Sequence, residues 1–162
     1  MKKIIFVVAA IVLLSSCKSG VRELELGSSM PEFALNDTLS SAQLQGNYAL
    51  LVFFASWCPG CQMELPHIDS LYAKYGGSGL HVLPIAREQT LQDVQDFWTE
   101  QGFAMPVYPD SAREVYAKFA EKHIPRAYLF APDGKLIFKS IGFEPGEENE
   151  LKEMLHSAFT MK

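Results

Sequence analysis

Hydrophobic positions along the chain follow two periods, one typical of strands and one typical of helices. Residues 48–55 and 81–86 are continuous apolar, β-prone runs, as expected for central strands covered on both faces. Between them, apolar residues over 65–75 recur at helical spacing until a glycine pair starting at Gly76, which predicts a helix that begins at or just after Cys58. We therefore expect strand, helix and strand in this order, as in a βαβ unit.

Capping signals predict two further helices. Thr90 and Asp93 have the pattern of a capping box at the start of a helix that Gly102 ends. Ser111 with Glu114 has the same spacing and predicts the start of another helix.

The C-terminal part of the chain predicts a hairpin followed by a helix. Residues 126–131 and 135–139 have the composition of strands, and the tight turn at 132–134 joins them as an antiparallel hairpin. Apolar residues over 151–158 have helical spacing. The whole pattern predicts an α/β fold with a mixed sheet, parallel in its βαβ half and antiparallel at the hairpin, and with helices on both faces.

The N-terminus has the pattern of an export signal. Two lysines at 2–3 precede an apolar run over 4–14, which is too short to span a bilayer comfortably as a mature helix. The sequence Leu-Ser-Ser-Cys at 14–17 resembles the lipobox of bacterial lipoproteins. That resemblance implies that residues 1–16 are a lipoprotein signal peptide and that Cys17 becomes the lipid-modified first residue. The alternative is a plain secretory peptide in which Cys17 has no role.

Composition predicts one globular domain after this leader. The chain has 162 residues, of which 48% are hydrophobic and 20% are charged. Residues 17–30 are polar and contain glycine and serine, which suits a flexible linker between a lipid anchor and a domain at 31–162. The formal net charge is -5, so no basic surface is available in bulk for phosphates, and nucleic acid is not expected as a partner.

The sequence contains three cysteines, and two of them, Cys58 and Cys61, are separated by only two residues. Two thiols do not make a structural zinc site, no second C-x-x-C is present, and His67 lacks the usual ligand spacing, so no metal is expected. A purely structural disulfide would close a loop too short to stabilise the fold strongly. Redox chemistry explains the pair better than either alternative.

The two cysteines have different expected duties. Cys58 falls at the predicted N-terminus of a helix, where free amide N–H groups and the helix dipole favour an anion, so we expect a nucleophilic thiolate there. Cys61, about one turn further along, should be less exposed. We expect Cys58 to form a mixed disulfide with its target and Cys61 to release the target by forming the Cys58–Cys61 disulfide.

Residues 53–61, together with Pro66, resemble the active-site region of the thioredoxin superfamily. The export signal and the downstream pattern resemble its exported, membrane-anchored TlpA/ResA-type branch, and the resemblance runs from about Pro31 to the C-terminus. It implies a thioredoxin-like three-layer fold and a cis-proline at Pro125, opposite the cysteine pair, with the backbone of Ile124 pairing with extended substrate. The alternative is that Pro125 only separates a helix from a strand.

We expect Trp57, Pro59 and Gly60 to contact substrate. Trp57 should pack beside the thiols, and the alternative is that its side chain fills the core. The dipeptide at 59–60 is Pro-Gly, whereas cytosolic thioredoxins have Gly-Pro, and this dipeptide influences the redox potential. No cofactor is expected.

The proton relay should differ from that of thioredoxins. Val52 stands where thioredoxins keep a buried aspartate. Glu64 follows Cys61 by three residues, on a nearby helix face, and resembles the active-site glutamate of the TlpA/ResA branch, so it could exchange a proton with Cys61. The alternative is that Glu64 is solvated; Glu88, after the second strand, is a weaker candidate for the same role.

The resemblance implies a thiol-disulfide oxidoreductase of the cell envelope, lipid-anchored and facing the periplasm or exterior. It would reduce disulfides of exported proteins, such as apocytochromes, and a membrane electron donor would reduce it again. An oxidase or isomerase would use the same residues. A peroxiredoxin would have proline and threonine or serine where Leu51 and Ala55 stand, and a copper chaperone using His123 would have a wider cysteine spacing.

Overall fold

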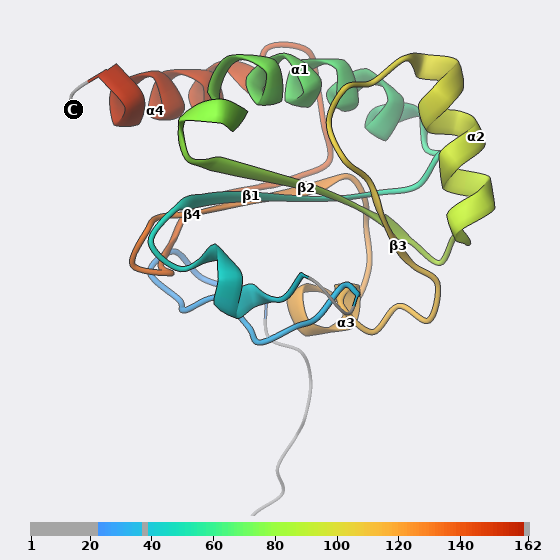
Figure 1. The fold of residues 1–162 in the computed structure, drawn as a ribbon, viewed down its shortest axis with the longest axis horizontal. Coiled ribbons are helices and arrows are strands. Elements are labelled where there is room, and N and C mark those ends of the chain that lie inside the picture. Colours follow the sequence, from blue (N-terminus) through green and yellow to red (C-terminus); the bar gives the residue numbers. More distant parts are fainter. Residues whose placement is uncertain (1–22, 37–38, 161–162) are drawn as a thin grey trace, which may run out of the picture.

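The computed structural model describes residues 23–36 and 39–160, and a five-stranded sheet lies at its centre (Figure 1). The strand order in this sheet is β3-β2-β1-β4-β5. The strands are β1 (Tyr48–Phe54), β2 (Leu80–Arg87), β3 (Tyr108–Asp110), β4 (Arg126–Phe130) and β5 (Leu136–Ile141). β1, β2 and β3 are parallel, and β4 is antiparallel to both β1 and β5. The predicted mixed sheet and its hairpin are confirmed, and β3 is an additional strand.

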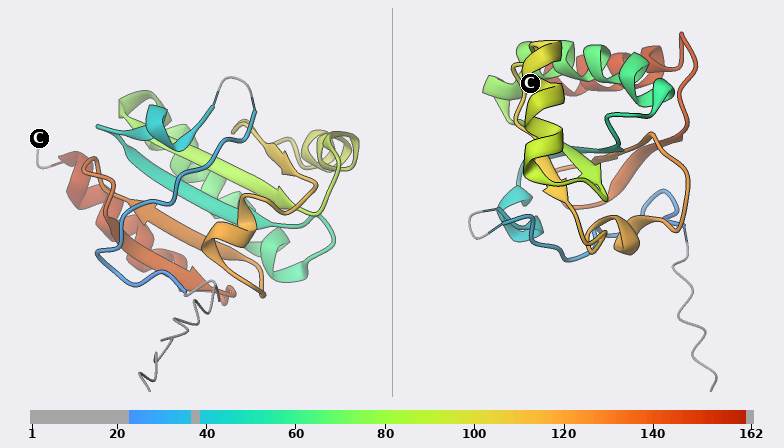
Figure 2. Two further views of the ribbon diagram at one scale, coloured as in Figure 1. Left: turned by 90° about the horizontal axis from the view of Figure 1, so that it is seen from below. Right: turned by 90° about the vertical axis from the view of Figure 1, so that its right-hand side faces the viewer.

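Helices cover both faces of the sheet, as predicted (Figures 1 and 2). α1 (Pro59–Tyr75), α2 (Leu91–Gln101) and α4 (Glu148–Thr160) lie on one side, and α3 (Tyr116–Phe119) lies on the other with the short 3-10 helix η1 (Ser41–Leu44). A second 3-10 helix, η2 (Gly76–Ser78), follows α1. None of the helices in the described part of the chain is both long and apolar enough to cross a membrane.

Alternate residues of β1 face two separate hydrophobic cores. Val52 belongs to the core beneath α1 and α4, whereas Phe53 belongs to the core on the α3 side. The ring centroid of Phe53 lies 5.3 Å from that of Tyr116, 5.1 Å from Phe119 and 6.0 Å from Tyr128. Because each buried aromatic side chain contributes about 1.5–3 kcal/mol, these cores hold the end of β1 firmly in place.

The N-terminal segment is packed on the domain from residue 23 onwards, so the predicted flexible linker up to residue 30 is wrong for this part. The N–H of Gly27 donates to the carbonyl of Leu136 (2.8 Å), and the N–H of Leu136 donates to the carbonyl of Ser28 (2.9 Å). These bonds cover β5, which is the last strand of the sheet and has an otherwise unpaired edge. Cys17 and the predicted signal peptide lie outside the described residues.

One of the two predicted capping boxes is present. At α2 the hydroxyl of Thr90 accepts the N–H of Asp93, whose carboxylate accepts the N–H of Thr90 in return, and Gly102 ends the helix with φ 69°. The helix predicted from Ser111 and Glu114 begins later, at Tyr116.

An aspartate replaces the predicted cap of α3. The carboxylate of Asp110 accepts the N–H groups of Val115 (3.2 Å) and Tyr116 (2.8 Å). Ser111 instead donates its hydroxyl to the carbonyl of Gln89 (2.8 Å), because the end of β3 brings residues 110 and 111 beside the loop after β2.

Candidate active site

Three segments meet at one edge of the sheet. β1 and β2 are parallel, with Phe54 opposite Ala86, so both strands end at this edge. β4 is antiparallel to β1 and begins there, with Arg126 opposite Phe53. The topology therefore places the C-x-x-C motif, the loop after β2 and the peptide preceding Arg126 next to one another.

Cys58 is the N-cap residue of α1 and has an extended backbone, φ -88° and ψ 115°. Its Sγ accepts the backbone N–H of Cys61 at 3.3 Å, and Pro59 occupies the first turn, where a missing N–H costs nothing. Both cysteines are free thiols in this structure. The sulfur of Cys58 thus lies where the N-terminus of a helix stabilises negative charge, as predicted.

The two thiols differ in exposure and in chemistry. Cys58 is 7% exposed, whereas Cys61 is fully buried. Burial raises the pKa of Cys61, and its hydrogen bond with Cys58 and the nearby negative charges of Cys58 and Glu64 raise that pKa further. Cys61 therefore keeps its proton until a base removes it.

The Ile124-Pro125 peptide lies against the cysteine motif and is cis, as the resemblance implies. A Cβ placed on Gly60 would lie 3.3 Å from Cδ of Pro125, so the motif and the proline are in contact. The Sγ of Cys58 lies 3.9 Å from the carbonyl oxygen of Ile124. A chain extended along Ile124 would therefore pass close to the exposed side of Cys58.

Apolar side chains are exposed near the thiols. Trp57 is 65% exposed rather than packed into the core, and Met63, on the second turn of α1, is 47% exposed. Exposed large aromatic side chains are typical of sites where a partner docks.

Glu64 is buried, so its interpretation as a solvated helix residue is wrong. It is 4% exposed, and its Oε2 has no hydrogen-bond partner among the described residues. Burial raises the pKa of Glu64 to about 8, and the negative charge of Glu147 adds to the effect. The carboxyl group lines a pocket of about 20 Å³ between α1, β5 and α4, which has room for about one water molecule.

The other predicted candidates lie apart from this chemistry. Val52 is fully buried in the apolar core, so β1 supplies no carboxylate beneath the thiols. Glu88 is half exposed and forms an ion pair with Arg87 at 2.6 Å. His67 also lines the pocket that contains Glu64, and its Nδ1 lies 3.9 Å from Oε1 of Glu148. In the described part of the chain, no group of three or more His, Cys, Asp or Glu side chains is placed to bind a metal ion.

Gln89 is a site residue that the sequence analysis missed. Its Oε1 accepts the N–H of Ser56 at 2.7 Å, and its Nε2 donates to the Ser56 hydroxyl at 2.6 Å. From α1, the Nε2 of Gln62 donates to the carbonyl of Ser56 at 2.6 Å. The turn that leads into Cys58 is therefore held from two sides. The only sequence signal was that Gln89 follows a strand parallel to β1.

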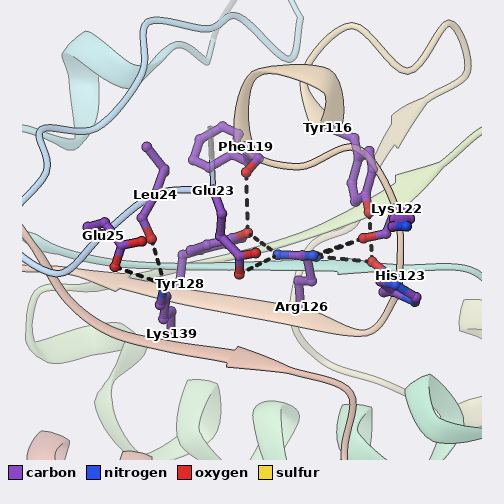
Figure 3. Close-up of polar contacts among 10 residues, drawn as sticks. All are labelled: Glu23, Leu24, Glu25, Tyr116, Phe119, Lys122, His123, Arg126, Tyr128 and Lys139. Atoms are coloured by element: carbon purple, nitrogen blue, oxygen red, sulfur yellow. Dashed lines mark hydrogen bonds and ion pairs between the residues drawn. The ribbon is translucent and has the colours of Figure 1, made fainter. Parts of the chain in front are cut away.

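Arg126 is a second residue that was missed. It follows Pro125 directly, is 4% exposed, and forms hydrogen bonds with the loop before the proline and with the N-terminal segment (Figure 3). In the sequence it reads only as the first residue of a strand.

Comparisons with known proteins agree with this geometry. The AhpC/TSA family model matches residues 26–139. The thiol-disulfide oxidoreductase ResA of Bacillus thuringiensis (strain Al Hakam) is 26% identical over 132 residues, which cover 79% of this chain and 76% of that protein.

Two solved structures of similar fold illustrate the likeness. A putative thiol:disulfide interchange protein DsbE from Chlorobium tepidum is similar with a TM-score of 0.77 and 24% identity, covering 85% of this chain and 99% of that one. StoA from Bacillus subtilis is similar with a TM-score of 0.62 and 25% identity, covering 81% and 95%. The thioredoxin-like, ResA-type resemblance is confirmed. The chain belongs to the AhpC/TSA family and is a thiol-disulfide oxidoreductase with a thioredoxin-like fold.

Proposed function

We propose that this enzyme reduces disulfides of exported proteins, apocytochromes among them, with Cys58 as the nucleophile and Cys61 as the resolving thiol. The observation that carries the proposal is the position of the Cys58 sulfur, 3.3 Å from the N–H of Cys61 and 3.9 Å from the carbonyl of Ile124. The export signal and the lipobox-like Cys17 support an enzyme anchored by lipid to a bacterial membrane, facing the periplasm or exterior.

The exchange runs in two steps. The Cys58 thiolate attacks one sulfur of the target disulfide, a mixed disulfide forms, and the other target sulfur leaves as a thiolate. Cys61 then passes its proton to the carboxylate of Glu64 and attacks the Sγ of Cys58. The Cys58–Cys61 disulfide forms, the second target thiol is released, and two electrons have passed to the target. A membrane dithiol donor must then reduce the enzyme again.

Trapping of the mixed disulfide tests the assignment of the two cysteines. Replacing Cys61→Ser should leave the first step intact and block the second, so exported proteins should accumulate as disulfides with Cys58. The double variant Cys58→Ser, Cys61→Ser is the matched control and should trap nothing. Trapping by the double variant, or no trapping by Cys61→Ser in cells that hold the protein in their envelope, would show that the assignment is wrong.

The redox potential decides the direction of electron flow. Related sites range from about -270 mV for thioredoxin to about -120 mV for a strong oxidant. A value near the reducing end supports the reductase, whereas a value near the oxidising end would replace it with an oxidase or isomerase that uses the same cysteines.

Two other activities have less support. Leu51 and Ala55, at the positions where a peroxiredoxin has its proline and hydroxyl residue, are both fully buried and apolar. A copper chaperone would bind about one equivalent of copper and fail to reduce insulin. Insulin reduction by the purified protein, measured against copper uptake and peroxide consumption, separates these activities.

A further inference from the structure

The guanidinium of Arg126 joins the loop before the cis-proline to the N-terminal segment (Figure 3). We propose that Arg126 is a positioning residue for disulfide exchange, holding the backbone of Lys122 and His123 so that the Ile124-Pro125 edge is presented to the target beside Cys58, with Glu23 completing this arrangement. The inference rests on the proposed function and extends it to residues outside the cysteine motif.

Every nitrogen of the Arg126 guanidinium is hydrogen-bonded. Nε donates to the carbonyls of Lys122 (3.1 Å) and His123 (3.2 Å), and Nη2 donates to the carbonyl of Lys122 (2.9 Å). Nη1 donates to Glu23 Oε1 and to the Tyr128 hydroxyl, both at 3.1 Å. A planar fork of donors suits this set of acceptors, which lie in different directions, better than a lysine ammonium does.

The backbone held by Arg126 has an unusual conformation. His123 has φ 71°, a left-handed value that is costly for a residue with a side chain and that persists only where the surroundings fix it. Two donors converge on its carbonyl, the Tyr116 hydroxyl at 2.6 Å and Nε of Arg126. This carbonyl belongs to the peptide that enters Ile124, so its orientation sets the direction of the Ile124 backbone. Loss of one donor would let the peptide turn and would move the Ile124 carbonyl away from Cys58.

Glu23 compensates the buried charge. The Arg126 side chain is 5% exposed, whereas that of Glu23 is 39% exposed, so the carboxylate closes the network from the solvent side. The same N-terminal segment is also held at a second point, where Lys139 Nζ donates to the carbonyl of Leu24 (2.9 Å) and lies 3.5 Å from Glu25. Because Lys139 holds the N-terminal segment without contacting the loop before Pro125, a Lys139 variant separates the effect of loosening the segment from the effect of loosening the loop.

The test compares Arg126→Met, Arg126→Lys and Glu23→Gln with a control, Lys139→Met, in insulin reduction assays with a dithiol donor. Arg126→Met should raise the KM about tenfold, which corresponds to about 1.4 kcal/mol of lost binding. Its kcat should change by less than about twofold, because the chemistry of the thiols is untouched. Arg126→Lys and Glu23→Gln should give smaller increases in KM, and Lys139→Met should keep the wild-type value.

Amide hydrogen exchange gives a second readout that does not depend on activity. The amides of His123, Ile124 and residue 126 should exchange faster in Arg126→Met and Arg126→Lys than in Lys139→Met. If the methionine variant does not fold, Arg126→Lys provides the comparison. The proposal would be overturned if Arg126→Met were less stable but kept the wild-type KM and the wild-type amide exchange of this segment. It would also be overturned if Lys139→Met raised the KM as much as Arg126→Met does. Failure of the wild-type enzyme to reduce insulin would count against the proposed function and leave the exchange result to decide the positioning role.

Discussion

The buried carboxyl group of Glu64 makes the stability of the folded protein depend on pH, and Glu64→Gln should abolish this dependence. Burial raises the pKa of Glu64 from its ordinary value of 4.5 to about 8. Since each pKa unit corresponds to 1.36 kcal/mol, ionising this group in the folded protein costs up to about 5 kcal/mol. That is a large fraction of the stability of a typical domain.

The sign follows from which state holds the proton. Below a pH of about 4.5 the carboxyl is protonated in both the folded and the unfolded chain and has no effect on their balance. Between about 4.5 and about 8 the unfolded chain has lost the proton and the folded chain still holds it, so stability falls as the pH rises. Above about 8 the loss is complete. Glutamine has nearly the same shape and cannot ionise.

Urea unfolding of the reduced proteins between about pH 5 and about pH 9 measures this effect. The free energy of unfolding of Glu64→Gln minus that of the wild type should grow up to about pH 8, towards about 5 kcal/mol, and then level off. Glu147→Gln should reduce the growth, because Glu147 adds to the raised pKa of Glu64. Glu153→Gln is the matched control for Glu147→Gln, because it removes an exposed carboxylate from α4, the helix that begins directly after Glu147. Parallel curves for wild type and Glu64→Gln would refute the reasoning.

Two further substitutions test the contacts around the motif. Gly60→Ala places a Cβ 3.3 Å from Pro125, so we expect slower insulin reduction. Urea unfolding should show unchanged or slightly increased stability, because alanine favours the helix. Insulin reduction at the wild-type rate would show that Pro125 moves to accommodate the Cβ without loss of activity. Gln89→Leu leaves the N–H of Ser56 without its acceptor and should lower the free energy of unfolding by about 1–3 kcal/mol. A value near zero in the same assay would show that water replaces Gln89.

Local signals predicted the part of the fold that carries the cysteines. The apolar run of β1 is buried on both faces, and the helix after it begins at Pro59, directly after Cys58. Both features depend on residues that are close together in the sequence, which is why pattern and capping rules find them. The capping box of α2 was predictable for the same reason.

Features that depend on distant pairing were not predictable. β3 has only three residues, one of them Pro109, so it has no period of its own and exists because Tyr108 pairs with Ile85. Residues 23–30 have no regular hydrophobic period. They are ordered by hydrogen bonds with β5 and by the packing of Leu24 and Met30 on the core, rather than by any local preference.

The missed site residues have the same explanation. Gln89 contacts Ser56 across 33 positions of the sequence, and Arg126 contacts Glu23 across 103. Neither residue belongs to a motif, and each acts by holding backbone that carries a recognised residue. A sequence pattern identifies reacting groups more readily than the groups that orient them. The chemistry limits which residue types can react and at what spacing, whereas only the fold determines which residues orient them.

The burial that lowers stability at high pH also bears on the proposed transfer of a proton from Cys61 to Glu64. Cys61 and Glu64 are both buried, and burial raises the pKa of both groups. In the proposed step, a proton leaving Cys61 goes to Glu64 only in molecules whose Glu64 is ionised. Their fraction grows with pH and reaches one half at about pH 8. With Val52 in the strand, the proposed base, Glu64, lies on α1 together with Cys61. The proposed proton transfer therefore predicts that the second step becomes faster over the pH range in which stability falls, because it assigns both effects to the same desolvated carboxyl group.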